Sequence, residues 1–125
     1  PADALLDLTL CEPAMGSGAF LNEVVNQVAE AYLERKQAEL RRRDPEHPGI
    51  PADRYLRELQ RVKARIAANQ CYGVDLNPLA AELGKTSLWL NVLRAGVPAP
   101  FFDARIATGN SLVGARRAVV RATCR

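Results

Sequence analysis

Apolar and polar positions follow one another along the chain in blocks that predict three strands and three helices. Residues 5–11 are mostly apolar, which is typical of a parallel strand buried on both faces. Over 18–43 apolar residues recur every four positions, so we expect a helix with one buried stripe. The stripe consists of Phe20, Val24, Val28 and Tyr32, with Leu21, Val25 and Leu33 alongside it. The second half of this helix, 34–43, is almost entirely polar, and we expect it to project into solvent.

A proline-rich break at 44–51 separates this helix from a second one. The second helix is predicted over about 53–69, where apolar residues again stand at helical spacing. These residues are Tyr55, Leu59, Val62 and Ile66. The polar half of the first helix and the second helix, about 34–69, together predict a helical hairpin inserted between two strands of the sheet.

A second strand is predicted at 71–76, and a third helix follows it. Asn77 and Pro78 are residues that helices prefer at the N-cap and at the first helical position. The apolar face of this helix, expected to be buried, consists of Leu79, Leu83, Leu90 and Leu93. Some large apolar residues are expected in the core rather than against a ligand. They are Phe20, Leu88 and Trp89.

A third strand at about 104–108 completes the pattern. The order of elements predicts an α/β fold with a three-stranded parallel sheet, right-handed crossovers and three layers. Because a sheet of three strands has open edges, we count a homodimer formed through those edges among the expected outcomes.

The composition changes this picture little. With 125 residues, 48% of them hydrophobic and 25% charged, the chain has the composition of one soluble globular domain. A net charge of +3 supports a nucleic-acid partner only weakly, because a solvated surface explains it equally well. No apolar run is long enough to span a membrane, and the N-terminus lacks a signal-peptide pattern. The first residue is Pro1, so we expect a cut made inside a longer protein.

The three cysteines, Cys11, Cys71 and Cys124, show no CxxC spacing. Two of them stand in or beside predicted strands. We therefore expect reduced thiols that behave as small hydrophobic residues in a cytoplasmic protein, and no structural zinc.

The segment from Leu8 to Leu21 carries the candidate chemistry. It reads as a strand, an acidic residue, a Gly-Ser-Gly turn and a helix, and a second strand ends in Asp75. This is the plan of a nucleoside-cofactor site, because a carboxylate there can accept both ribose hydroxyls. The plan fits NAD or S-adenosylmethionine. The second is favoured, because Leu21 replaces the third glycine of the dinucleotide motif and Glu12 would repel a pyrophosphate but attract an ammonium group.

Three segments resemble motifs of one enzyme family. Segment 12–21, Glu-Pro-Ala-Met-Gly-Ser-Gly-Ala-Phe-Leu, resembles the first motif of the amino-methylating DNA methyltransferases that modify adenine at its exocyclic nitrogen. Segments 72–78, Tyr-Gly-Val-Asp-Leu-Asn-Pro, and 109–112, Gly-Asn-Ser-Leu, look like the second and third motifs. The likeness is closest to the large adenine-specific enzymes of restriction-modification and BREX-type phage-exclusion systems. It implies a Rossmann-like class I methyltransferase fold, S-adenosylmethionine as cofactor and double-stranded DNA as partner.

The resemblance also implies roles for individual residues. Glu12 would orient the amino acid end of the cofactor, and the Gly-Ser-Gly backbone would follow its methionine part. Asp75 would hold the ribose hydroxyls, with Leu76 against the adenine face. Asn110 stands where the family often has Asp, but an amide can also hydrogen-bond the adenine edge. The implied cofactor-binding residues are Glu12, Pro13, Ala14, Gly16, Ser17, Gly18, Asp75, Leu76 and Asn110.

Each of these residues also has a purely structural interpretation. The glycines Gly16 and Gly18 could form only a tight strand-to-helix turn, and Asp75 could be a solvated strand end. The side chain of Asn110 could cap its own backbone in a turn.

The fourth family motif, an Asn, Asp or Ser followed by Pro-Pro and an aromatic residue, does not occur, since the sequence has no Pro-Pro pair. In the family that motif binds the flipped target base, so the resemblance implies no catalytic residue within 1–125. We therefore expect the cofactor-binding part of an adenine N6-specific DNA methyltransferase. Two alternatives remain open: a non-catalytic nucleotide-binding module, and a methyltransferase that acts on protein or RNA.

Overall fold

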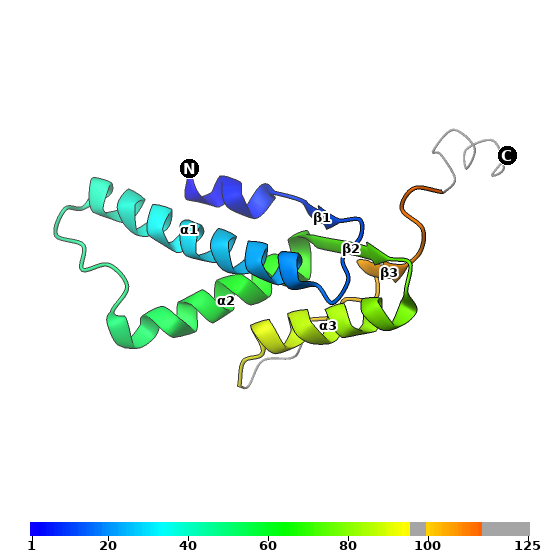
Figure 1. Cartoon of the computed structure of the whole chain (residues 1–125). Helices are drawn as coiled ribbons and strands as arrows, with labels where there is room; N and C mark the ends of the chain where they lie inside the picture. The colour runs from blue at the N-terminus through cyan, green and yellow to red at the C-terminus, as the bar shows by residue number, and fades with distance from the viewer. Residues whose placement is uncertain (96–99, 114–125) are drawn as a thin grey trace, which may run out of the picture.

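The computed structural model describes residues 1–95 and 100–113. A short 3-10 helix, η1, precedes three strands and three α-helices (Figure 1). In chain order the elements are η1 (Ala2–Asp7), β1 (Leu10–Glu12), α1 (Ala19–Arg43), α2 (Ala52–Gln70), β2 (Cys71–Asp75), α3 (Pro78–Val92) and β3 (Ile106–Thr108).

The three strands form one parallel sheet in the order β1-β2-β3, as predicted. Leu10 of β1 is paired with Cys71 of β2, and Gly73 of β2 is paired with Ile106 of β3. The three-stranded parallel sheet with its helices is compatible with a Rossmann-like fold. In the described residues no helix is long and apolar enough to cross a membrane.

The sheet is covered on one face only, so the expected third layer is absent from the described residues. Cys71 and Gly73 are buried, whereas Tyr72 between them is 38% exposed. Successive side chains of a strand point to opposite faces, so these exposures distinguish a covered face from an open one. On the open face the guanidinium of Arg105 lies 5.8 Å from the ring centroid of Tyr72. Cys11 is also exposed, so a buried role for this cysteine was wrong.

The first strand is shorter than predicted, because Ala2–Asp7 form the η1 helix. Hydrogen bonds from the buried side chain of Gln70 allow the backbone before β1 to leave the sheet. Its side-chain amide donates hydrogen bonds to the carbonyls of Leu5 and Leu8, both at 2.9 Å. Those carbonyls therefore need no neighbouring strand.

The hairpin of α1 and α2 is present, with 44–51 as its connection (Figure 1). Its status as an insertion stays a prediction. The polar half of α1 does not simply project into solvent, because η1 packs along it. The backbone N–H of Ala2 donates to Glu39 at 2.7 Å, and Lys36 forms an ion pair with Asp3 at 2.9 Å.

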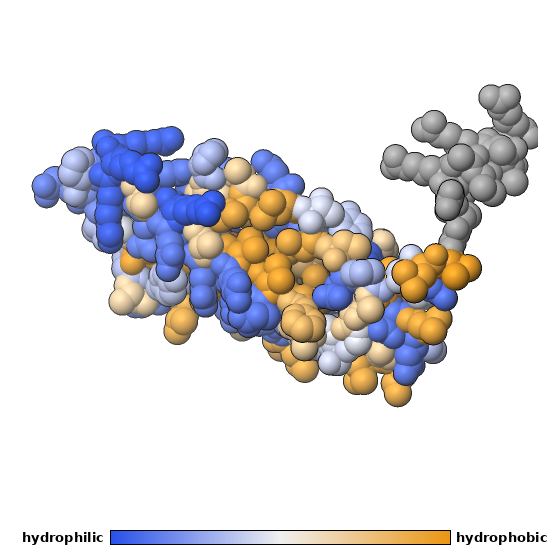
Figure 2. All heavy atoms as spheres, turned by 45° about the horizontal axis from the view of Figure 1, so that its top comes forward, coloured by the Kyte–Doolittle hydropathy of each residue, from blue (hydrophilic) through white to orange (hydrophobic). Residues whose placement is uncertain are grey.

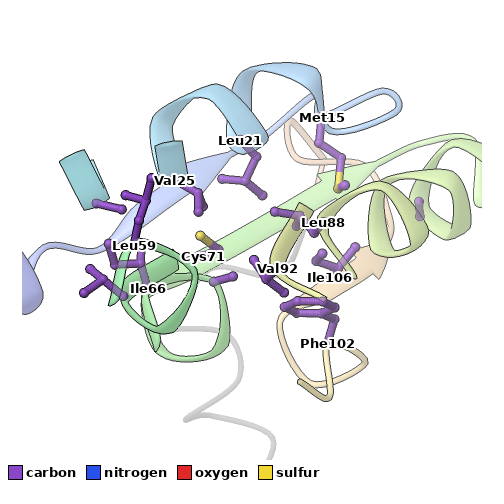
Figure 3. Close-up of a cluster of buried hydrophobic side chains, with 14 of the residues drawn as sticks. Met15, Leu21, Val25, Leu59, Ile66, Cys71, Leu88, Val92, Phe102 and Ile106 are labelled. Carbon is purple, nitrogen blue, oxygen red and sulfur yellow. The ribbon is translucent and has the colours of Figure 1, made fainter. Parts of the chain in front are cut away.

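The core lies between the three helices and the covered face of the sheet (Figure 3). The prediction for α1 is confirmed for Leu21, Val25 and Leu33, which are buried, but the row expected at the centre of the stripe is not: its first member, Phe20, is 78% exposed. The buried stripe consists of Leu21, Val25, Ala29 and Leu33. Cys71 is fully buried, and burial raises the pKa of its thiol to about 12, so it behaves as the inert hydrophobic residue expected of it. Cys124 lies outside the described residues.

The buried face of α3 is the opposite of the predicted one. Its buried residues are Ala81, Gly84, Leu88 and Val92. All four leucines expected in the core are at least half exposed: Leu79, Leu83, Leu90 and Leu93. The prediction for Leu88 is confirmed, whereas Trp89 keeps 38% of its surface exposed. The correction has a steric cause: the helix approaches the loop after β1 so closely that only its side with Gly84 fits there.

Candidate cofactor site at the carboxyl ends of the strands

Hydrogen bonds bring the three motif segments together where the parallel strands end. The backbone N–H of Met15, after β1, donates to the carbonyl of Val74 at 3.0 Å. The backbone N–H of Gly109, after β3, donates to the carbonyl of Asp75 at 2.9 Å. The hydroxyl of Ser111 donates to the carbonyl of Pro13 at 2.8 Å. Segments distant in sequence therefore form one edge, where open α/β sheets bind ligands.

The glycine turn between β1 and α1 requires glycine at two positions. Gly16 has φ +53° and Gly18 has φ +79°, a left-handed conformation that other residues rarely adopt. Gly18 also lies against α3, where a Cβ atom on it would stand 3.3 Å from the Cα of Gly84. A Cβ on Gly16 would meet no atom within 4 Å. The turn is therefore closed toward α3 and open at Gly16.

Met15 fixes the turn from beneath, a role that the sequence analysis missed. Its side chain is 4% exposed and points from the turn into the core (Figure 3). Its thioether group occupies the space where a Cβ atom would stand on Gly73 of β2 or on Gly84 of α3. A glycine inside a strand and another inside a helix were the sequence signals for this close packing.

Asp75 joins the glycine turn to the start of α3. Its Oδ1 accepts from the backbone N–H of Asn77 and its Oδ2 from that of Gly16, both at 2.8 Å. These two N–H groups, that of Asn77 first, hold the pKa of Asp75 below its ordinary value. Asn77 in turn caps α3, since its side chain accepts from the backbone N–H of Leu79 at 2.9 Å.

The other predicted residues surround this carboxylate with varying exposure. Glu12 is half-buried at the end of β1. Leu76 is 71% exposed, so its side chain is free to contact a ligand. The other predicted cofactor-binding residues of the first motif that are exposed are Pro13, Ala14 and Ser17.

Asn110 folds back on its own backbone. Its Oδ1 accepts from the N–H groups of Leu112 at 2.9 Å and Val113 at 3.1 Å. This is the turn-capping role expected as the structural alternative. The oxygen is used for the turn, so the hydrogen-bonding capacity of this side chain toward a ligand rests mainly on its NH₂ group.

This edge carries charge of both signs, so it suits a ligand that has a positive group and hydroxyls for the carboxylates and a negative group for the helix N-termini. The helices α1 and α3 both begin here, and helix N-termini carry partial positive charge. The carboxylates of Glu12 and Asp75 add two negative charges beside them.

Within the part of the chain that the structure describes, no group of three or more His, Cys, Asp or Glu residues could hold a metal ion.

Sequence comparison gives one informative match. The chain is 27% identical, over 126 aligned positions, to a protein of Methanocaldococcus jannaschii described as "Putative type II restriction enzyme and methyltransferase". The alignment covers 90% of this chain but only 9% of that protein. No family model matches the chain, and no solved structure matches it. The match supports an origin related to restriction-modification methyltransferases.

A separate cleft of about 240 Å³ lies away from this edge, between α3 and the segment that leads into β3. Lys85, Trp89 and Phe101 are among the residues that line it. The cleft contains none of the predicted cofactor-binding residues, so we assign it no part in the cofactor site.

Proposed function

We propose that this chain is the S-adenosylmethionine-binding part of a DNA methyltransferase that acts on the exocyclic amine of adenine. One observation carries the proposal: Asp75, the glycine turn and the Asn110 segment are joined by hydrogen bonds at one edge of the sheet. The relationship to a protein described as a restriction enzyme and methyltransferase supports it.

The residues at this edge fit the chemistry of S-adenosylmethionine. The ammonium group of the cofactor would lie near Glu12, with its methionine part along the backbone of the open turn at Gly16. Each carboxylate oxygen of Asp75 already accepts one N–H, but an ionised carboxylate has about four acceptor sites. Asp75 can therefore accept ribose hydroxyls while it holds the turn. Leu76 would contact the adenine ring, and the NH₂ group of Asn110 would donate to the ring edge.

The bound cofactor would supply an electrophilic methyl group on its sulfonium. The work of these residues is to hold that group in a fixed position, which lowers the entropic cost of the transfer. We propose no catalytic residue in this chain, because the fourth motif is missing from the sequence. We therefore expect the 125-residue chain alone to transfer no methyl group to DNA. Double-stranded DNA as a partner and a cytoplasmic location stay predictions.

A second candidate function is a nucleotide-binding module without chemistry of its own. Asp75 supports it as well, because a carboxylate at the end of this strand can hold the ribose of any nucleoside ligand. A methyltransferase acting on protein or RNA stays an alternative from the sequence alone.

Calorimetric titration of the chain tests the proposal. We expect S-adenosylmethionine and its demethylated product to bind, and NAD not to bind. Asp75→Ala should abolish binding because it removes the ribose acceptor and one anchor of the turn. Asp53→Ala is the matched control, since Asp53 is an exposed carboxylate in the first turn of α2.

Circular dichroism of each variant separates loss of binding from loss of fold. A folded chain that binds neither cofactor form would contradict the proposal, and binding of NAD in their place would favour the nucleotide-binding module. Methylation of DNA by rigorously pure chain would overturn the expectation that the chain is inactive alone.

A further inference from the structure

A row of arginines lies on one face of α2. Arg57, Arg61 and Arg65 follow one another at intervals of four residues, which places their side chains on the same side of the helix. All three residues are exposed. Hydrophilic residues gather over the tip of the hairpin, whereas the apolar surface lies nearer the sheet (Figure 2). The row is therefore part of a polar surface that is open to solvent in the described residues.

Two hollows in the surface meet at this row. One, of about 310 Å³, lies between η1, α1 and α2, and Lys36 and Arg65 are among its lining residues. The other, of about 740 Å³, lies between α2 and the end of α3, and its lining includes Arg57 and Arg94. Arg61 lines both hollows, so they form one depression, which we call the arginine groove. The cations of the groove are Lys36, Arg57, Arg61, Arg65 and Arg94.

Positive charge predominates in the groove far more than in the chain as a whole. The chain has 17 Lys and Arg against 14 Asp and Glu. Among the described residues that line the groove, five are cationic and Glu58 alone is acidic. Like charges four positions apart on a helix repel one another and destabilise it slightly. An anionic partner therefore explains the row better than the needs of the fold do.

Ion pairs within the chain neutralise only part of this charge. Arg61 lies 3.7 Å from Glu58, and Lys36 lies 2.9 Å from Asp3. Within residues 1–95 and 100–113 the other three cations of the groove form no ion pair. Segments 96–99 and 114–125 contain neither Asp nor Glu, so their side chains supply no carboxylate. Three guanidinium groups are thus available to an external anion.

The arrangement of the groove favours the phosphates of a nucleic-acid duplex. Successive arginines of the row are about 6 Å apart along the helix, so the row suits a repeating anion better than a single phosphate. The planar guanidinium of arginine also matches the geometry of phosphate oxygens.

The aromatic content of the groove distinguishes a duplex from a single strand. Tyr32 is the one aromatic residue among the described residues that line the groove. It is half-buried, and its hydroxyl lies 3.3 Å from the carboxylate of Asp3. Single strands are usually held by bases stacked on exposed aromatic rings, and the groove offers no such platform. Its chemistry therefore fits the outside of a duplex, whose bases are already stacked.

We propose that the arginine groove binds the phosphate backbone of double-stranded DNA. The choice of DNA rests on the proposed function, whereas the duplex and its phosphates follow from the groove itself. None of the predicted cofactor-binding residues lines the groove, so the two sites are separate. Phosphate contacts position a duplex without reading its sequence. We expect weak, sequence-independent binding, with a Kd of about 1–100 μM at physiological salt.

Fluorescence anisotropy with a short labelled DNA duplex tests the proposal in the absence of cofactor. Arg57→Glu combined with Arg61→Glu should weaken binding at least about tenfold, because it replaces two phosphate contacts by repulsion. The matched control combines Arg42→Glu with Arg43→Glu, an equal change of charge at two exposed residues in the last turn of α1. The control should weaken binding less than about twofold. Equal losses in the two variants would show that net charge alone attracts DNA, which overturns the proposal.

The salt dependence of binding measures the individual contacts. Each phosphate contact that is lost should lower the slope of log K against log salt concentration by about 0.9. We expect this change for Arg57→Ala and for Arg65→Ala, and no change for Arg43→Ala. A slope that stays the same in both groove variants contradicts the proposal.

Competition with unlabelled polymers identifies the partner. Duplex DNA should displace the labelled duplex at lower concentrations than single-stranded DNA or polyglutamate does. Stronger displacement by single-stranded DNA or by an RNA duplex would refute the assignment to double-stranded DNA. Stronger displacement by polyglutamate would assign the groove to an acidic protein segment instead.

Calorimetric titration of the same variants with S-adenosylmethionine separates this proposal from the proposed function. The groove variants should bind the cofactor as the wild-type chain does, and circular dichroism verifies their fold. DNA binding through the groove by a chain that binds no cofactor would refute the proposed function alone. Cofactor binding by a chain whose affinity for DNA is unaffected by the groove substitutions would refute the groove alone.

Discussion

The candidate site at the strand ends and the hairpin of α1 and α2 are stabilised in opposite ways. At the strand ends, Gly18 and Gly84 let the turn and α3 approach closely, because a Cβ atom on Gly18 would stand only 3.3 Å from the Cα of Gly84. In the hairpin, side chains fill the space, and Ile66 of α2 is fully buried. The strand ends require positions that have no side chain, whereas the hairpin requires side chains that fill its core. Substitutions should therefore damage the hairpin by removing atoms and the site by adding them.

Removal of a side chain from the hairpin should have the largest effect. We expect Ile66→Ala to lower the free energy of unfolding by about 2–5 kcal/mol, because it leaves a cavity in a fully buried position. Urea denaturation measures the loss. Leu56→Ala on the same helix is the control and should change stability by less than about 0.5 kcal/mol, since Leu56 is 70% exposed. Equal losses in the two variants would refute the hairpin half of the comparison.

Addition of one methyl group at the site should come next. We expect Gly84→Ala to destabilise the chain by about 1–3 kcal/mol, because the new methyl group would displace the end of the Met15 side chain, which is 4% exposed and enclosed by the core. Helix propensity alone predicts the reverse, a gain of up to about 1 kcal/mol. Gly109→Ala is the control, because its Cβ would meet its nearest atom at 3.8 Å.

A double-mutant cycle identifies the atoms responsible. In a Met15→Ala background the space beneath the turn is empty, so Gly84→Ala should no longer destabilise. If the cost of Gly84→Ala is unchanged without Met15, the close packing described here is not its cause.

Replacement of Asp75 by asparagine should have a smaller effect on stability, and this effect should depend on pH. Its pKa in the folded chain is lowered by the N–H groups of Asn77 and Gly16, so it stabilises the fold above the ordinary aspartate pKa. That contribution is lost as pH falls through the lowered pKa. We expect urea midpoints of the wild-type chain to decline more steeply than those of Asp75→Asn below about pH 4. Parallel declines would show that the two hydrogen bonds do not hold the carboxylate.

The ion pair between η1 and α1 of the hairpin should have the smallest effect. Asp3 and Lys36 lie 2.9 Å apart at the surface, where water and salt screen the attraction. Asp3→Asn should therefore shift the urea midpoint only slightly, and high salt should remove the shift. A loss as large as that of Ile66→Ala would mean that η1 depends on this pair rather than on packing.

The sequence predicted best those features that depend on neighbouring residues. The cap formed by Asn77 and Pro78, the strand ending in Asp75 and the glycine turn are all present, because each depends on a few adjacent side chains. The turn-forming alternative for Asn110 was local for the same reason, and it is what the structure shows. Caps and turns depend on residues that are adjacent in the sequence, so they can be predicted without knowledge of the fold.

Features that depend on contact between distant segments were missed. The leucines of α3 suggested a buried face because they are large and regularly spaced, but the fold buries the side with Gly84. The η1 helix was read as a strand because the capping role of Gln70, more than 60 positions later, leaves no trace in the local pattern. The anchoring of the glycine turn by Asp75 is likewise a contact across 59 positions.

The shared carboxylate of Asp75 has a consequence for motion. One side chain holds the amide hydrogens of Gly16 and Asn77, so any fluctuation that withdraws it exposes both to solvent at once. Their exchange with deuterium should therefore proceed at linked rates, although 60 residues of chain lie between them. A ligand that binds this carboxylate would slow both exchanges together. Exchange at the two amides would therefore detect binding before any change of shape is visible.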